Sequence, residues 1–256
     1  MTSSINTNVG AFVALQNLNI INARLNAVQN QVATGLKVAS AVDDASSFAI
    51  AQGIRGSIKA YAAVSQGIAN GRGVATVSLA GANAISDILG DIQAKITQGE
   101  NAGNSTAQQS ILNADFQNLV AQINTFIANA TYNGRNLLSA GSSSINVIAN
   151  IDGSTLAIRS NSSFSLDSIN LGNQNISSTV QAAQALSALQ LAQASIATVL
   201  GNLGADTKAI NFQDSFISQL SDASNVGLGS IVDADLRGLP RSCRLCRCSS
   251  SSRSRP

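Results

Sequence analysis

The stretch that decides the fold is residues 11–32, AFVALQNLNIINARLNAVQNQV. Its apolar side chains recur at alternating steps of three and four residues, which places seven of them on one stripe of a helix: Ala11, Ala14, Leu18, Ile21, Leu25, Val28 and Val32. The flanks of the stripe are rich in Asn and Gln and carry one charge, Arg24. A helix of this length, roughly 33 Å, needs a partner helix in water. The stripe therefore predicts a function in assembly, with these seven residues as subunit-packing residues.

The composition excludes most chemistry. The 256 residues include no His and a single Glu, Glu100. Without His the chain lacks the commonest general base and the commonest metal ligand. All three Cys lie near the C-terminus, at Cys243, Cys246 and Cys248, without a fourth ligand for a metal. We therefore expect no catalytic residues, no metal and no cofactor, and the chain is predicted not to be an enzyme.

The charge is divided unevenly along the chain. Residues 1–236 hold 9 Lys and Arg against 13 Asp and Glu, whereas residues 237–256 hold six Arg and no acid. The overall balance of +2 is therefore no argument for binding nucleic acid. No stretch reaches about 18 consecutive apolar residues, and no basic segment followed by an apolar run opens the chain, so we expect neither a membrane span nor a cleaved signal peptide.

Helical spacing continues after a break at Ala39–Asp44. Asp43 or Asp44 is expected to cap a long helix that runs from Asp44 to about Thr97, with its glycines as close-packing points: Gly53, Gly56, Gly67, Gly71, Gly73 and Gly81. The alternative is two helices broken at Gly71–Gly73. A third helix is predicted over residues 112–130, before the turn dipeptide Asn133-Gly134.

Strand-like alternation then replaces the helical spacing. Residues 145–151 and 156–158 alternate apolar and polar side chains on either side of Asp152-Gly153, which predicts a β-hairpin. A third short strand is expected at Phe164–Ile169, and a final helix from about Ser178 to Ser224. The fold class predicted is mostly α, an elongated antiparallel bundle of long helices with a small β-hairpin insertion.

Several segments resemble bacterial flagellin. They are Ile5-Asn6-Thr7-Asn8, residues 33–45 (ATGLKVASAVDDA), residues 132–138 (YNGRNLL) and Ile231-Val232-Asp233-Ala234-Asp235, which resembles the segment introducing the terminal helix of that family. The segments occur in the family's order over residues 1–236.

The resemblance implies a filament subunit for motility that is exported unfolded through the flagellar type III channel to the extracellular flagellum. The implied partners are other flagellin subunits, an export chaperone and the filament cap. The implied organisation is an N-terminal filament-core helix over 1–40, a helical rod in two parts over 41–137 and 178–236, and a small β-hairpin region over 138–177. Residues 237–256 form a separate basic tail rich in Cys, Ser and Arg. The family's variable outer domains are missing between the third and last helices, so the chain resembles a core-only flagellin.

Asp43 and Asp44 are adjacent, so their carboxylates are expected to diverge. We expect them to serve as a cap and a subunit contact and not as an acid–base pair.

The alternative to a filament subunit is a flagellin-like surface adhesin or binding protein, or a hook–filament junction protein.

The tail departs from the family. After Leu236 a flagellin continues as an amphipathic, Gln-rich helix, whereas this chain continues as RGLPRSCRLCRCSSSSRSRP. Leu-Gln codons read one base late give Cys followed by Arg or Ser, and that pair occurs at Cys243-Arg244 and Cys246-Arg247. We therefore interpret residues 237–256 as a frame-shifted, disordered tail. The stripe of residues 11–32 then loses its partner helix, and the chain as written is predicted not to polymerise.

Overall fold

A computed structural model describes residues 8–161 and 171–235 of the chain. In this part the elements are, in order, α1 (Val9–Thr34), α2 (Ala45–Gly99), α3 (Thr106–Asn129), β1 (Ile145–Ile148), β2 (Thr155–Ile158) and α4 (Thr179–Val232). The predicted class, mostly helical with one small hairpin, is confirmed. The third strand expected at Phe164–Ile169 and the tail over 237–256 lie outside the described residues.

The chain divides into two compact units. One comprises residues 60–220, and the other combines the segment up to Lys59 with the segment from Ser221. α2 and α4 pass through both units, whereas α3 and the hairpin belong to the first and α1 to the second. We call the first unit the bundle unit and the second the terminal unit.

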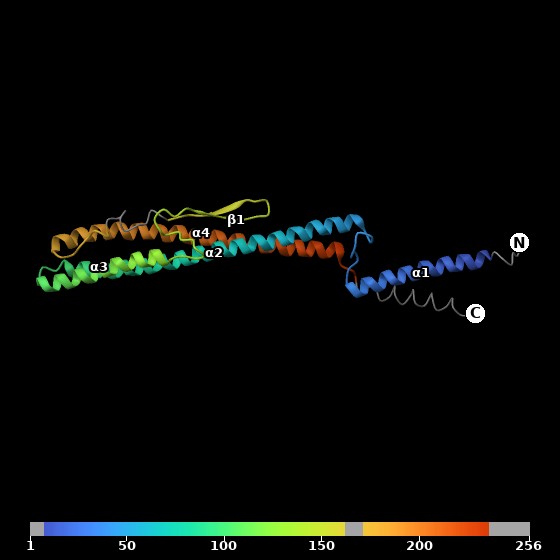
Figure 1. The fold of residues 1–256 in the computed structure, drawn as a ribbon, viewed down its shortest axis with the longest axis horizontal. Helices are drawn as coiled ribbons and strands as arrows, with labels where there is room; N and C mark the ends of the chain where they lie inside the picture. Colours follow the sequence, from blue (N-terminus) through green and yellow to red (C-terminus); the bar gives the residue numbers. More distant parts are fainter. Residues whose placement is uncertain (1–7, 162–170, 236–256) are drawn as a thin grey trace. The chain divides into compact units, whose positions relative to one another are not determined.

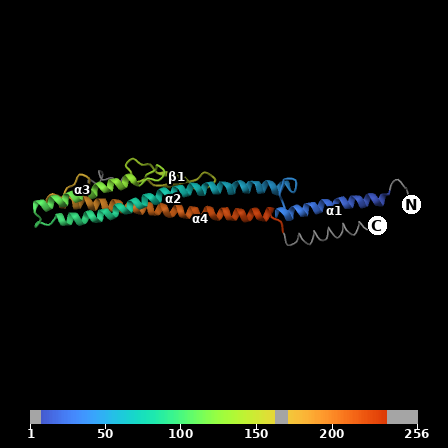
Figure 2. The same ribbon diagram turned by 60° about the horizontal axis from the view of Figure 1, so that its bottom comes forward.

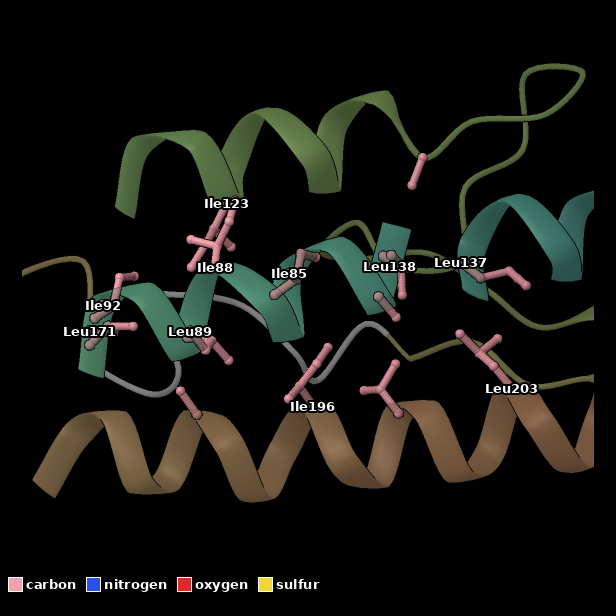
Figure 3. Packing of buried hydrophobic residues seen from close by; sticks show 14 of the residues in the cluster. Ile85, Ile88, Leu89, Ile92, Ile123, Leu137, Leu138, Leu171, Ile196 and Leu203 are labelled. Atoms are coloured by element: carbon pink, nitrogen blue, oxygen red, sulfur yellow. The ribbon is translucent and has the colours of Figure 1, made fainter. Parts of the chain in front are cut away.

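In the bundle unit α2 and α4 run side by side in opposite directions, and α3 lies along α2 (Figures 1 and 2). Hydrogen bonds between Ser65 and Asp214 and between Gln93 and Gln193 fix the antiparallel register of α2 and α4. The core between the helices is aliphatic: Ile85, Leu89 and Ile92 are fully buried beside Ile123 of α3 and Ile196 of α4 (Figure 3). Burial of each such side chain contributes about 1.5–3 kcal/mol.

α2 is one unbroken helix of 55 residues, so the alternative of a break at Gly71–Gly73 is wrong. Three of the six glycines named above are close-packing points. A Cβ atom at Gly71 would lie 2.5 Å from Val147 Cγ2, one at Gly73 would lie 2.6 Å from Tyr132 Cζ, and one at Gly81 would lie 2.9 Å from Ala130 Cβ. The prediction is wrong for Gly53, Gly56 and Gly67, where a Cβ would meet no atom of the chain within 4 Å.

α3 begins six residues earlier than its apolar spacing indicates. Ser105 accepts a hydrogen bond from the Gln108 amide, and the Gln108 side chain accepts one from the Ser105 amide. This capping box satisfies two amides that an α-helix leaves unpaired at its start. Ala130, predicted as the last helical residue, is instead the C-cap.

The hairpin is shorter than its alternating sequence predicts. β1 and β2 pair antiparallel, with Ile145 opposite Ile158 and Val147 opposite Leu156, so these four side chains share the face toward the bundle core. Ile151, expected in the first strand, lies in the turn, where the amide of Gly153 bonds the Asn150 carbonyl.

α4 continues eight residues beyond the predicted Ser224. Ile231 and Val232, expected to introduce another helix, are its last residues. In the terminal unit Val232 packs with Val38 and Ala51 in a second, much smaller buried cluster, which Leu36, Phe48, Leu228 and Ile231 partly cover.

α2 and α4 are long and apolar enough to cross a membrane by length and composition alone. Core helices of soluble proteins pass the same test. In the described structure 39% of the apolar window of α2 and 33% of that of α4 are buried, and both helices contribute residues to the core described above.

Candidate subunit-packing surface

The helix that the opening stretch predicts is present and capped at both ends. The Asn8 side chain accepts a hydrogen bond of 3.2 Å from the Ala11 amide at the start of α1. At its end Gly35 adopts a left-handed backbone, with φ of 72°, and its amide bonds the Gln31 carbonyl. α1 thus spans 26 residues, from Val9 to Thr34.

None of the residues of α1 is buried in the described structure. Of the predicted packing residues, Ala11, Ala14 and Val32 are exposed, while Leu18, Ile21, Leu25 and Val28 are half-buried. Large apolar side chains outside the stripe are exposed as well, namely Val9, Phe12, Val13, Leu15 and Ile20. An isolated helix gains little from such a surface, because helices in proteins owe most of their stability to packing.

The Asp43 carboxylate closes the turn before α2. Its Oδ2 atom accepts hydrogen bonds from the Ala39 amide at 3.0 Å, the Ser40 amide at 2.9 Å and the Ser40 hydroxyl at 3.1 Å. These bonds, that of the Ser40 amide above all, hold the pKa of Asp43 below its ordinary value of 3.8. The turn leaves the Val42 side chain 95% exposed.

The Asp44 carboxylate bonds residues that follow it in the chain and caps α2, as predicted. It accepts hydrogen bonds from the amides of Ser46 and Ser47 and one of 2.6 Å from the Ser47 hydroxyl. The Ser47 hydroxyl is the main reason that the pKa of Asp44 is lowered. The two carboxylates thus bind different partners, which accounts for both residues without acid–base chemistry.

Backbone bonds join the end of α1 to the end of α4. The Lys37 amide bonds the Val232 carbonyl at 2.7 Å, and the Ala234 amide bonds the Gly35 carbonyl at 2.9 Å. Leu36 and Asp233 form an antiparallel bridge between these bonds. The segment after α1 is therefore held by secondary structure, whereas α1 itself is held by none of the buried contacts that organise α2–α4.

The bundle unit carries a separate apolar groove of about 400 Å³. It lies between α2, from Ala63 to Val74, the turn at Tyr132–Arg135 and strand β1. The Tyr132 ring packs on Gly73, and Val147 packs on Gly71, so the glycines form the floor on which the turn and strand rest. In the segment Gly71-Arg72-Gly73 the two glycines allow close packing on α2. The Arg72 guanidinium forms an ion pair with the Asp214 carboxylate, with 3.1 Å between Nη1 and Oδ2.

Two polar arrangements were missed by the sequence reasoning. On α3 the side chains of Gln109, Asn113 and Gln117 form what we call the amide ladder, because all three bond the backbone of residues 174–176. Between the end of β2 and α4, the guanidinium of Arg159 bonds the nearly buried Asp206 carboxylate at 2.8 Å, which raises the pKa of Arg159. Amides four residues apart on α3 are the signal that would have indicated the ladder.

Metal ligands are not grouped in the described part of the chain: no three His, Cys, Asp or Glu side chains there could hold one ion. The three cysteines of the tail lie outside the described residues. The surface that remains for function is apolar and helical, which suits contact with another helix better than chemistry on a small molecule.

Comparisons with known proteins identify the family of the chain. A family model described as the bacterial flagellin N-terminal helical region matches residues 5–143. Flagellin FljK of Caulobacter vibrioides is 32% identical over 235 residues, covering 91% of this chain and 86% of that protein, and a flagellin of Brucella melitensis is 32% identical over 246 residues with the same coverage. The crystal structure of Bacillus cereus flagellin matches 68% of this chain and 90% of that one at 16% identity, with a TM-score of 0.40. The chain belongs to the bacterial flagellin family, the structural proteins of the extracellular flagellar filament.

Proposed function

We propose that α1 is the helix through which this flagellin packs against neighbouring subunits, and that the chain as written cannot complete this packing. The observation that carries the proposal is the apolar surface of α1, which contains no buried residue although Leu18, Ile21, Leu25 and Val28 recur at helical spacing. Removing such side chains from water at an interface contributes about 25 cal/mol per Å² of apolar area.

The turn after α1 supports a second contact of the same kind. Val42 is 95% exposed on a turn that the Asp43 carboxylate holds closed through three hydrogen bonds. An exposed apolar side chain on a fixed turn loses little conformational entropy when it is buried by a partner. We assign Asp43 and Asp44 the role of shaping this contact.

The sequence after Leu236 supports the assembly defect. A filament-core helix that pairs with α1 needs apolar residues at helical spacing, whereas residues 237–256 contain six Arg, two Pro and a run of Ser. α1 then keeps its apolar surface in water. We propose that a chain with the restored reading frame after Leu236 forms filaments and that the present chain stays monomeric.

The remaining functional roles follow from the family. We propose export through the flagellar type III channel without a cleaved signal peptide, recognition by an export chaperone and the filament cap, and no membrane-spanning role for α2 or α4. Both helices contribute residues to the bundle core, which supports a role for them in helix packing. Catalysis has no place in this function.

Sedimentation of four proteins tests the packing role of α1: the chain as written, the frame-restored chain, and the frame-restored chain with either Leu25→Asp or Asn22→Asp. We expect the frame-restored chain to pellet as filaments and its Leu25→Asp variant to stay in solution, because an aspartate in the packed stripe would bury an unpaired charge. Asn22→Asp places the same charge on the flank of the stripe, so this matched control should still pellet.

Two outcomes would contradict the proposal. Filaments formed by the chain as written would show that the native terminal helix is unnecessary. Filaments formed by Leu25→Asp as readily as by Asn22→Asp would remove the stripe from the interface. Electron microscopy of cells lacking the gene separates a filament subunit from a surface adhesin, since only the loss of a filament subunit shortens or removes filaments.

A further inference from the structure

The tripeptide Asn-Gly-Arg occurs twice, at residues 70–72 and at residues 133–135. The first copy lies inside α2, and the second forms the exposed turn between α3 and the hairpin. We propose that Asn133 is a site of spontaneous deamidation and isoaspartate formation, and that the helix protects Asn70 from the same reaction. The proposal concerns how the folded subunit ages and is independent of whether it polymerises.

The reaction needs only the chain and water. The backbone nitrogen of the glycine attacks the side-chain Cγ of the asparagine, a C–N bond forms, and the side-chain nitrogen leaves as ammonia with the proton of the amide. Water then opens the resulting succinimide at either carbonyl and gives Asp or isoaspartate. A following glycine favours the attack because no Cβ obstructs its nitrogen.

The turn presents both reacting groups to water. Tyr132 and Arg135 exchange two backbone hydrogen bonds of 2.9 Å, which close the turn on either side of Asn133 and Gly134. Both central residues have positive φ, 50° and 73°, and both are exposed. Within residues 8–161 and 171–235, no hydrogen bond engages the Gly134 amide or the Asn133 carboxamide. The nucleophile and the electrophile are therefore both unpaired.

The copy in α2 differs from the turn in the state of its glycine amide, which would be the nucleophile. The Asn70 side chain is exposed as well, so access of water to the carboxamide does not distinguish the sites. The Gly71 amide, however, lies in the middle of α2, where each amide bonds the carbonyl four residues earlier. Gly71 is buried against Val147 and Ile158. Attack at Asn70 therefore requires local opening of α2 where it packs against the hairpin.

Deamidation at Asn133 would change more than one charge. Isoaspartate routes the backbone through the side chain, so the paired geometry of Tyr132 and Arg135 is lost. The same turn seats the Tyr132 ring on Gly73 and forms one wall of the groove beside β1. We expect the aged turn to release Tyr132 from α2.

Incubation of the full-length protein at mildly alkaline pH, followed by tryptic digestion and fragment mass spectrometry, tests the proposal. Each deamidation adds about one mass unit, and isoaspartate separates from aspartate by retention time. In folded protein we expect Asn133 to react at least roughly ten-fold faster than Asn70, because the helical site reacts only from locally opened molecules. In denaturant the two sites should react at similar rates, since the reacting residues are the same.

The variant Asn133→Gln is the matched control, because it keeps the amide but would have to close a larger ring. It should show no mass gain at the turn and unchanged behaviour at Asn70. Equal rates at the two asparagines in the folded protein would overturn the proposal. So would an Asn133 that stays intact in the folded protein while it reacts in denaturant.

Discussion

α1 and the bundle unit are built from similar apolar residues at similar spacing, yet they end in opposite environments. In α2, Ile85, Leu89 and Ile92 are fully buried, whereas no residue of α1 is buried. The difference lies in the neighbours: α2 is covered by α3, α4 and the hairpin of its own chain, and α1 has no such cover among the described residues. Helical periodicity therefore indicates that a helix needs a partner, but it does not say whether the partner belongs to the same molecule.

The largest expected effect on stability comes from placing one aspartate in the bundle core and comparing it with the same substitution on α1. Ile123→Asp places a carboxylate in the fully buried core of the bundle and should lower the free energy of unfolding by about 3–5 kcal/mol. Ile21→Asp makes the same change on α1 and should leave the thermal unfolding of the bundle unchanged. Circular dichroism melts of both variants measure this. A large loss of stability from Ile21→Asp would show that α1 is packed within the monomer.

The amide ladder tests polar contacts in the bundle. Gln109 is nearly buried and donates to the carbonyls of Gly99 and Ile176, so Gln109→Ala leaves both acceptors without this donor. We expect a loss of about 1–3 kcal/mol in denaturant unfolding. Gln122→Ala, on the exposed face of the same helix, is the control and should be neutral. Equal effects would mean that the ladder contributes nothing to stability.

Glycine substitutions sharpen the comparison within α2. Gly71→Ala should destabilise the bundle by about 1–3 kcal/mol, because the new methyl group meets the stiff, branched side chain of Val147. Gly67→Ala, where the Cβ meets open space, should stabilise the helix by up to about 1 kcal/mol. A lower melting temperature for Gly71→Ala and a higher one for Gly67→Ala would confirm that Val147 packs closely on Gly71. A gain of stability at both positions would refute it.

The smallest effect expected is a local response to pH in the turn before α2. The pKa of Asp43 is lower in the folded protein than its ordinary value of 3.8, so its stabilisation of the turn is complete above that value and is lost as the pH falls through the lowered pKa. Hydrogen exchange at the Ala39 and Ser40 amides should accelerate below about pH 3.8 relative to other amides. Asp43→Asn should weaken this response, and an unchanged response would assign it to another group.

Sequence reasoning was most reliable where a periodic pattern coincided with a start or stop signal. The stripe of α1, the Asp44 cap and the course of α2 followed from spacing and capping residues. The end of α4 did not, because Gly227 and Gly229 resemble a stop signal although the helix continues through them. The amide ladder was missed as well: the four-residue spacing of its amides indicates a polar stripe on α3, but it does not indicate that the stripe bonds the backbone of residues 174–176.

The amide ladder bonds the backbone of residues 174–176 and not their side chains. Gln109, Asn113 and Gln117 bond two carbonyls and one amide of the backbone at residues 174–176. These three bonds do not depend on which side chains the bonded residues carry, although the side chain of Ile176 is buried. Such a clasp places almost no sequence requirement on the polypeptide that precedes it. A longer segment inserted between β2 and Leu171 would still be followed by residues 174–176, which the ladder bonds before α4 begins. That part of the sequence can therefore vary in evolution while the packing of the helices is kept.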